Sequence, residues 1–348
     1  MDLQVLWFCL VGFFFAGYFL LEGFDFGVGL LLPFLPRNEE ERSTMFRTIG
    51  PVWDGNEVWL VVAGGAMFAA FPAWYATMFS GFYIALLLLL VFLIVRVLSF
   101  EWRERHEHSR WLGVWGWLNT IGSLGAALIW GVAFSNLLYG VPINSSGDFD
   151  GTFWDLFNPY TLLGGVAVVL LFAFHGATYL TLRTTGELCR RAAVAAGRLS
   201  IATAVVGAGY LIWTVAVAVD RNDKELFPPL LPALLAIAAL LGAVVCVRVA
   251  RSGWAFALTA AGAFLLVATI FTSLYPRVMV ASNDVANSLT VADSSSANYT
   301  LKVMSVVALI VTPLILLYQG WTYHVFRARL GVVEAAPPVE LVPPEAGA

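Results

Sequence analysis

Long apolar runs, each of roughly 18 to 25 residues, recur along this sequence and limit the folds open to it. A run of that length matches the hydrocarbon core of a membrane, about 30 Å, at the 1.5 Å rise per residue of an α-helix. Only 12% of the residues are charged, against about 25% in soluble domains, so a soluble fold could not cover this apolar surface. The sequence therefore predicts an all-α, polytopic membrane protein.

The apolar runs predict nine transmembrane helices. Their approximate bounds are residues 5–32, 55–72, 78–99, 113–138, 160–181, 200–219, 228–250, 254–274 and 303–326. Residues 1–330 form a single transmembrane helical domain in this prediction. The remaining stretch, 331–348, is rich in proline and glutamate and is predicted to be a disordered cytoplasmic tail.

The distribution of basic residues tests the number of crossings, because the loops of a nine-helix chain alternate between two sides. One side carries Arg37, Arg42, Arg47, Arg96, Arg103, Arg105, Arg110, Arg183, Arg190, Arg191, Arg198, Arg248, Arg251, Arg327 and Arg329, and the other carries Arg221, Lys224, Arg277 and Lys302. Cytoplasmic loops of membrane proteins are enriched in Lys and Arg. This division of the 19 basic residues predicts nine crossings, with the N-terminus outside and the C-terminus in the cytoplasm.

Four carboxylates fall in or beside the first two predicted spans. Glu22 and Asp25 lie inside the first span, where each charge costs about 3 kcal/mol on insertion scales. They belong to a glycine-rich stretch, 17–29, whose small residues permit close helix approach. Asp54 and Glu57 open the second span and lie on one helix face because they are three residues apart. We expect the four acids to form a ladder leading inward from the cytoplasm.

This ladder has a functional and a structural interpretation. Carboxylates in a dry region titrate near neutrality and pass protons through waters, which predicts a proton path through the four acids. In the structural interpretation, Asp54 or Asn56 caps the second helix. The acids of the first span are then tied to a backbone group or to an arginine.

Histidine offers few ligands for a haem. A b-type haem needs axial ligands at matching depth on facing helices, and the spans contain only His175 and His324. His175 is expected to hydrogen-bond within the bundle instead. The 3 cysteines show no paired spacing, and the sequence contains no nucleotide-binding or zinc-binding motif. We therefore expect no cofactor, no metal and no catalytic residue in this chain.

A series of short motifs runs through the chain in order. They are EGFDFGVG at 22–29, WDGNEVWL at 53–60, AGGA at 63–66, FSGFY at 79–83, GVAF at 131–134, GVP at 140–142, GATYL at 176–180, SLT at 288–290 and the last span at 301–318. Together these blocks resemble subunit II of the cytochrome bd quinol oxidases along nearly the whole chain. The WDGNEVW stretch is a specific signal rather than a generic apolar one.

The resemblance implies two four-helix bundles plus one peripheral helix, paired with a subunit I that carries haem b and haem d and the quinol-oxidising loop. It implies a respiratory complex in the inner membrane of a bacterium. Such a complex oxidises quinol and reduces O2 to water, drawing protons from the cytoplasm without pumping them. Small accessory membrane subunits are a partner class left open, and nucleic acid is not expected.

The resemblance also assigns roles to single residues. Asp54 matches the family acid on the cytoplasmic proton path at the subunit interface, and Asp25 matches a family acid in the first span. Trp59 matches a residue near a lateral access route for oxygen. Gly116 stands where some members carry an acid near the start of the fourth span, so no role for that acid carries over.

A stand-alone secondary transporter is the alternative function. Intramembrane acids would then bind the substrate or the coupling ions. Helices broken by Gly or Pro at matching positions of two halves would indicate such a transporter, and the sequence shows no evident pair of this kind.

Overall fold

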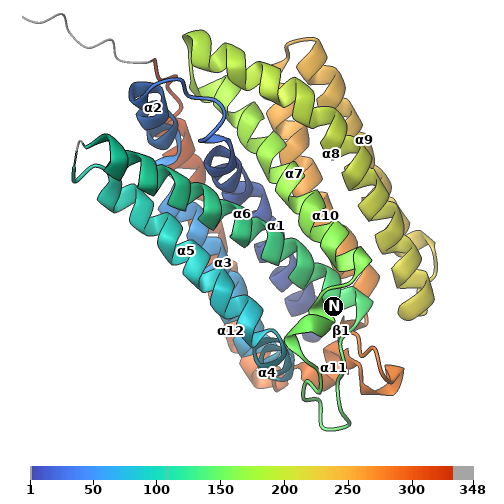
Figure 1. Cartoon of the computed structure of the whole chain (residues 1–348). Helices are drawn as coiled ribbons and strands as arrows, with labels where there is room; N and C mark the ends of the chain where they lie inside the picture. The colour runs from blue at the N-terminus through green and yellow to red at the C-terminus, as the bar shows by residue number, and fades with distance from the viewer. Residues whose placement is uncertain (1, 107, 332–348) are drawn as a thin grey trace, which may run out of the picture.

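Long helices lie side by side in one bundle, and short elements close its two ends (Figure 1). The structure is a computed structural model and describes residues 2–106 and 108–331. Residues 332–348 of the predicted tail lie outside the described residues. The predicted all-α membrane fold is confirmed.

The elements follow one another along the chain with short connections. The helices are α1 (Leu3–Leu31), α2 (Glu39–Ile49), α3 (Trp53–Ala70), α4 (Pro72–Gly81), α5 (Tyr83–Arg103), α6 (Ser109–Tyr139), α7 (Pro159–Arg183), α8 (Gly186–Arg221), α9 (Phe227–Arg248), α10 (Ser252–Leu274), α11 (Val291–Ser294) and α12 (Asn298–Val325). Two 3-10 helices are η1 (Phe153–Leu156) and η2 (Val285–Asn287). The antiparallel strands β1 (Arg277–Met279) and β2 (Leu289–Thr290) form a small hairpin beside α11.

Eight of the described helices are long and apolar enough to cross a membrane. The predicted span 55–72 corresponds to α3, which is not among these eight; α3 has 18 residues and opens with polar side chains at positions 54, 56 and 57. It runs from the end of the bundle that holds α2 to the end that holds α4 (Figure 1). The first and last described residues lie at opposite ends of the bundle, as an odd number of crossings requires (Figure 1). Nine crossings and the orientation stay predictions.

Two predicted starting residues and one predicted loop differ from the structure. The helix predicted to start at residue 200 starts at Gly186, because the Ala-rich and Arg-rich stretch before 200 favours helix despite its charge. The short loop after the first span contains α2, whose N-terminus is capped by the side chain of Asn38. The span predicted from residue 78 begins at Tyr83, because α4, which Pro72 starts, occupies the preceding residues.

The long helices form two sets that meet at α1 and α6. Helices α7, α8, α9 and α10 pack each against the next, while α3 and α6 pack on α1, and α5 packs on α6. At the meeting of the sets, a Cβ atom at Gly27 would collide with the backbone of Phe172 and Gly176 in α7, so the predicted close helix approach is confirmed. Helix α12 is peripheral, since only 6% of its most apolar stretch is buried, against 72% for α6 and α7.

Candidate functional site

An ion pair lies inside the bundle, between α1 and α5. Glu22 and Arg96 are both fully buried, and a carboxylate oxygen of Glu22 contacts the Arg96 guanidinium. This guanidinium lies 4.6 Å from the ring centroid of Phe26 and 5.5 Å from that of Phe100. The structural interpretation, that an acid of the first span is tied to an arginine, is therefore confirmed for Glu22.

Asp25, one turn further along α1, is held by a hydrogen-bonded asparagine. The Asn56 side-chain amide donates to Asp25 Oδ2 over 2.7 Å, and its carbonyl oxygen accepts from Gln319 Nε2 and Tyr323 OH, each over 2.7 Å. The same amide also donates to the Leu21 carbonyl over 3.3 Å. Asn56 thus connects α1, α3 and α12 at one point.

The two acids of α3 differ in their surroundings. Asp54 is exposed in the first turn, and Glu57, one turn deeper, is half-buried. Neither Asp54 nor Asn56 caps this helix, because the N-cap residue is Val52 and no side chain caps it. The capping alternative is wrong, since the Asn56 side chain instead hydrogen-bonds to Asp25 of α1 and to Gln319 of α12.

Arg96 connects the acids of the two helices electrostatically. Its guanidinium contacts Glu22 of α1, and Glu57 of α3 and Asp25 of α1 lie close enough to act on its charge. Asp54 lies one turn before Glu57 on α3, three residues away and on the same helix face. Glu22, Asp25, Glu57 and Arg96 therefore form one cluster, with the exposed Asp54 at its outer edge. Their role as a proton path stays a prediction.

Several buried polar atoms of this cluster have no protein hydrogen-bond partner among the described residues. They are Tyr18 OH, Glu22 Oε2, Asp25 Oδ1, and Arg96 Nε and Nη2. Buried polar groups are nearly always hydrogen-bonded to protein or to ordered water. The cluster is therefore suited to hold water rather than to exclude it.

Trp59 lies on another face of α3, away from the acids. It is buried against Gly17 of α1, with edge contacts to Phe13 at 5.9 Å and to Phe14 at 6.3 Å. It also lines an apolar cavity of about 680 Å³ between α1, α3 and α12. The predicted position beside a lateral access route for oxygen is compatible with this cavity and is not tested by it.

His175 uses both ring nitrogens inside the bundle. Nε2 lies 3.0 Å from the Leu20 carbonyl, and Nδ1 lies 2.7 Å from Thr259 Oγ1. A carbonyl only accepts, so Nε2 carries the proton and Nδ1 accepts one from the hydroxyl. The expectation that His175 hydrogen-bonds within the bundle is confirmed. Within residues 2–106 and 108–331, no three His, Cys, Asp or Glu residues lie where they could hold a metal ion.

Two parts of the cluster were not predicted from the sequence. Arg96 was counted among the basic residues of one side, although it falls within the predicted span 78–99 and an arginine there signals a buried partner. The contribution of α12, through Gln319 and Tyr323, has no local sequence signal because the contact joins residues more than 260 positions apart.

Comparison with known proteins places this geometry in a family. Residues 3–326 match the family described as cytochrome bd terminal oxidase subunit II. The chain is 43% identical to cytochrome bd ubiquinol oxidase subunit 2 of Bacillus subtilis, over 94% of this chain and 97% of that protein. It is 38% identical to cytochrome bd-I ubiquinol oxidase subunit 2 of Escherichia coli K12, over 94% and 95% of the two chains.

A solved structure has the same fold. The chain matches a chain in the structure of bd oxidase from Geobacillus thermodenitrificans with a TM-score of 0.67 and 12% identity, over 93% of this chain and 98% of that one. At this identity the likeness concerns the fold alone. The match to the family over residues 3–326, together with relatives at 43% and 38% identity, shows that this chain belongs to the cytochrome bd terminal oxidase subunit II family.

Proposed function

We propose that this chain is the haem-free subunit of its quinol oxidase complex and delivers protons from the cytoplasm towards a haem-bearing partner. The relatives named above are subunits of ubiquinol oxidases, which supports work within such a complex rather than as a stand-alone transporter. Haem b and haem d then lie on subunit I, where quinol is oxidised and O2 is reduced to water. Both ring nitrogens of His175 are hydrogen-bonded and so are not available to ligate a haem, which supports placing the haems on the partner subunit.

The buried acid cluster carries this proposal. Protons enter at the exposed Asp54, pass to Glu57 and reach Glu22 and Asp25 beside Arg96. The support is the order of burial along these acids, together with the unpartnered polar atoms that waters would join. A single arginine faces three carboxylates here, so a proton held among them lowers the net buried charge.

The cavity beside Trp59 fits the second proposed role, access of O2 from the membrane. Oxygen is apolar and dissolves in the hydrocarbon core, so an apolar cavity between α3 and α12 offers it a path without polar barriers. Trp59 fills the space between α3 and Gly17 of α1 and would limit the width of such a path.

The exposed apolar helices indicate where the partners lie. Helix α12 is nearly unburied, and only 28% of the most apolar stretch of α5 is buried. Both helices lie beside α3 (Figure 1), which carries the exposed Asp54, so we place subunit I against α3, α5 and α12. Helix α9, also 28% buried, lies on the far side of the bundle and is the face that remains for lipid or a small accessory subunit.

Replacing Asp54 by Asn tests the proton path. We expect quinol oxidation by the purified complex to slow by roughly tenfold, since proton delivery then limits turnover. Subunit content and the reduced-minus-oxidised haem spectrum should stay normal, because Asp54 is exposed and forms no salt bridge within the described residues.

The matched control is Glu40→Gln, an exposed acid of α2 whose side chain makes no hydrogen bond within the described part of the chain. Turnover of Asp54→Asn equal to this control would refute the path through Asp54. Loss of haem together with activity would instead give Asp54 a role in assembly.

A further inference from the structure

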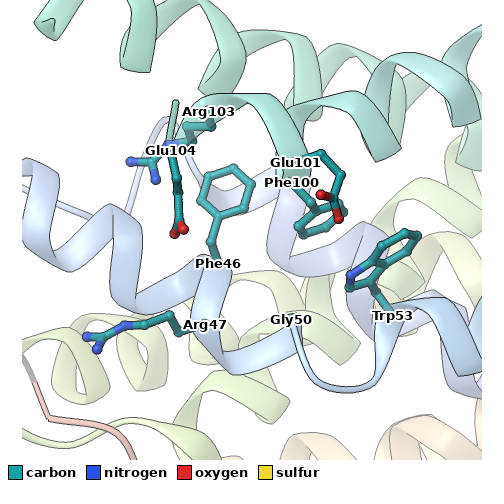
Figure 2. Close-up of a pocket in the computed structure, with 8 residues that line it drawn as sticks. All are labelled: Phe46, Arg47, Gly50, Trp53, Phe100, Glu101, Arg103 and Glu104. Atoms are coloured by element: carbon teal, nitrogen blue, oxygen red, sulfur yellow. The ribbon is translucent and has the colours of Figure 1, made fainter. Parts of the chain in front are cut away.

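A second cavity, with charged side chains in its wall, lies at the α2 end of the bundle, apart from the apolar cavity beside Trp59. This vestibule measures about 210 Å³ and is lined by Phe46, Arg47, Gly50, Trp53, Phe100, Glu101, Arg103 and Glu104. It lies between the turn that joins α2 to α3 and the end of α5 (Figure 2). A water molecule occupies about 30 Å³ in the liquid, so the vestibule has room for several.

Two carboxylates line one wall of the vestibule. Figure 2 shows Glu101 and Glu104 on the α5 side, facing the turn that carries Gly50 and Trp53. Both are exposed, and neither forms a salt bridge within the described residues. Their negative charges therefore act on the water of the vestibule.

Two arginines share the wall of the vestibule with these carboxylates. Arg103 pairs with Glu39 of α2 and lies over the Phe46 ring at 4.7 Å, and Arg47 donates to Thr44 Oγ1 over 3.0 Å. Arg103 is 2% exposed, yet its Nε has no protein acceptor among the described residues. A buried donor of this kind on the cavity wall indicates water in the vestibule.

One aromatic ring separates the vestibule from the buried ion pair. Phe100 lines the vestibule and stacks on Trp53 with ring centroids 5.1 Å apart and planes at 4°. The guanidinium of Arg96, which pairs with Glu22, lies 5.5 Å from the centroid of the same Phe100 ring. Vestibule and acid cluster are thus neighbours across a single side chain.

We propose that the vestibule is a proton-collecting chamber for the acid cluster, with Glu101 and Glu104 as collecting groups and the stacked Phe100 and Trp53 as its inner barrier. A hydronium ion in bulk water protonates a carboxylate, which releases the proton to vestibule water. Passage of water beside Phe100 then leads to Arg96 and Glu22. This inference rests on proton uptake by the cluster, but its route does not pass through Asp54.

The double variant Glu101→Gln/Glu104→Gln tests the collecting role. Proton delivery limits turnover sooner at alkaline pH, because the hydronium concentration falls tenfold per pH unit. We expect quinol oxidation by the whole complex to fall about threefold relative to wild type at pH 8.5 and to be unchanged at pH 6. The charges that share the vestibule wall with these groups, on Arg47 and Arg103, are kept.

The control is Glu40→Gln/Glu187→Gln, which removes the same two negative charges from exposed positions at the same end of the bundle, outside the vestibule. A control as slow as the test variant at pH 8.5 would mean that general surface charge causes the effect. A test variant as fast as wild type at pH 8.5 would overturn the collecting role.

The barrier is tested by Phe100→Ala in the Asp54→Asn background. Loss of the Phe100 ring opens the vestibule to the acid cluster. Turnover should therefore be at least about threefold higher than in Asp54→Asn alone, at normal haem content. No recovery in an assembled complex would overturn the barrier. If the alanine variant does not assemble, Phe100→Leu keeps apolar volume and should recover in part. If Asp54→Asn itself is not slow, the Asp54 route fails, while the glutamine variants still decide the vestibule.

Discussion

The bundle contains two buried polar centres of different chemistry. The charged centre, between α1, α3 and α5, comprises Glu22, Asp25, Asn56, Glu57 and Arg96, and the neutral centre, between α6, α7 and α8, comprises Ser135, Tyr160, Tyr210 and Thr214. Both lie among apolar helices, where an unpaired polar group is costly. They meet this constraint in different ways.

The neutral centre satisfies its own hydrogen bonds. Ser135 Oγ lies 2.8 Å from Tyr210 OH, and Tyr160 OH lies 3.0 Å from Thr214 Oγ1. The rings of Tyr160 and Tyr210 also stack with centroids 5.5 Å apart. All four hydroxyls have protein partners, so this centre needs no water. Its chemistry is that of helix packing.

The charged centre contrasts with it, because unpartnered atoms of Glu22, Asp25 and Arg96 remain inside the protein. A bundle that only needed packing would not retain charges that cost several kcal/mol each to bury. The difference teaches that the centre between α1, α3 and α5 keeps buried charge with unpartnered polar atoms, while the four hydroxyls of the neutral centre are all hydrogen-bonded.

The largest expected effect comes from breaking the buried ion pair. Arg96→Gln leaves Glu22 without its counter-ion and should destabilise the chain by about 3 to 5 kcal/mol, so that little complex assembles. Tyr210→Phe, which removes one hydroxyl from the neutral centre, should cost only about 1 kcal/mol. The measurement is the yield and the thermal midpoint of the purified complex.

The double variant Glu22→Gln/Arg96→Gln separates charge from shape in this test. Removing both charges leaves no uncompensated ion, so assembly should recover above the level of Arg96→Gln alone. If the double variant assembles no better, Arg96 acts through its packing on Phe26 and Phe100 rather than through its charge. If Tyr210→Phe is as damaging as Arg96→Gln, the contrast between the centres fails.

A smaller effect is expected at the asparagine that joins the charged centre to α12. Asn56→Ala removes the partner of Asp25, Gln319 and Tyr323, and should cost about 2 to 3 kcal/mol through unpaired buried groups. Turnover per haem should fall as well, because Asp25 loses the donor that positions it. Thermal midpoint and quinol oxidation rate are the two readouts.

Asn136 of α6 provides the matched control. It is fully buried, and its amide donates to the Val132 carbonyl over 2.9 Å and to the Leu156 carbonyl over 2.8 Å. Asn136→Ala should lower the thermal midpoint but leave turnover per haem unchanged, since only backbone partners are lost. Normal turnover per haem in Asn56→Ala would show that Asn56 contributes to stability but not to the activity of the charged centre.

Sequence patterns predicted the helices well because length and hydropathy act locally. They also located Glu22 and Asp25 as residues that need partners, since a carboxylate within a span is costly wherever it lies. The identity of those partners depends on which helices meet, and this is set by packing, as at Gly27 against Gly176. Arg96 within the predicted span 78–99 indicates a buried partner, but the hydropathy pattern could not show which helix supplies that partner.

The smallest expected effect concerns a link between the two halves at the α2 end. Glu41 Oε2 accepts hydrogen bonds from the Arg37 backbone N–H over 2.6 Å and from Arg191 Nη2 of α8 over 2.5 Å. Burial alone would raise the pKa of Glu41, but these two donors outweigh it and hold the pKa below its usual range. Glu41 therefore stabilises the fold above the carboxyl pKa of the unfolded chain, about 4.3, and this stabilisation is lost as pH falls through the lower folded-state pKa.

Glu41→Gln tests this link between the halves. At pH 7 it should cost about 1 kcal/mol after allowance for solvent screening, a fall of roughly 2 °C in thermal midpoint. The difference from wild type should shrink below about pH 4, where the wild-type carboxyl is protonated too. Glu187→Gln removes an exposed ion pair with Arg190. This variant should shift the thermal midpoint less, because both residues of that pair belong to α8. An equal shift in the two variants would show that the link contributes no more than a surface ion pair, and that helix packing through α1 and α6 holds the charged and neutral halves together.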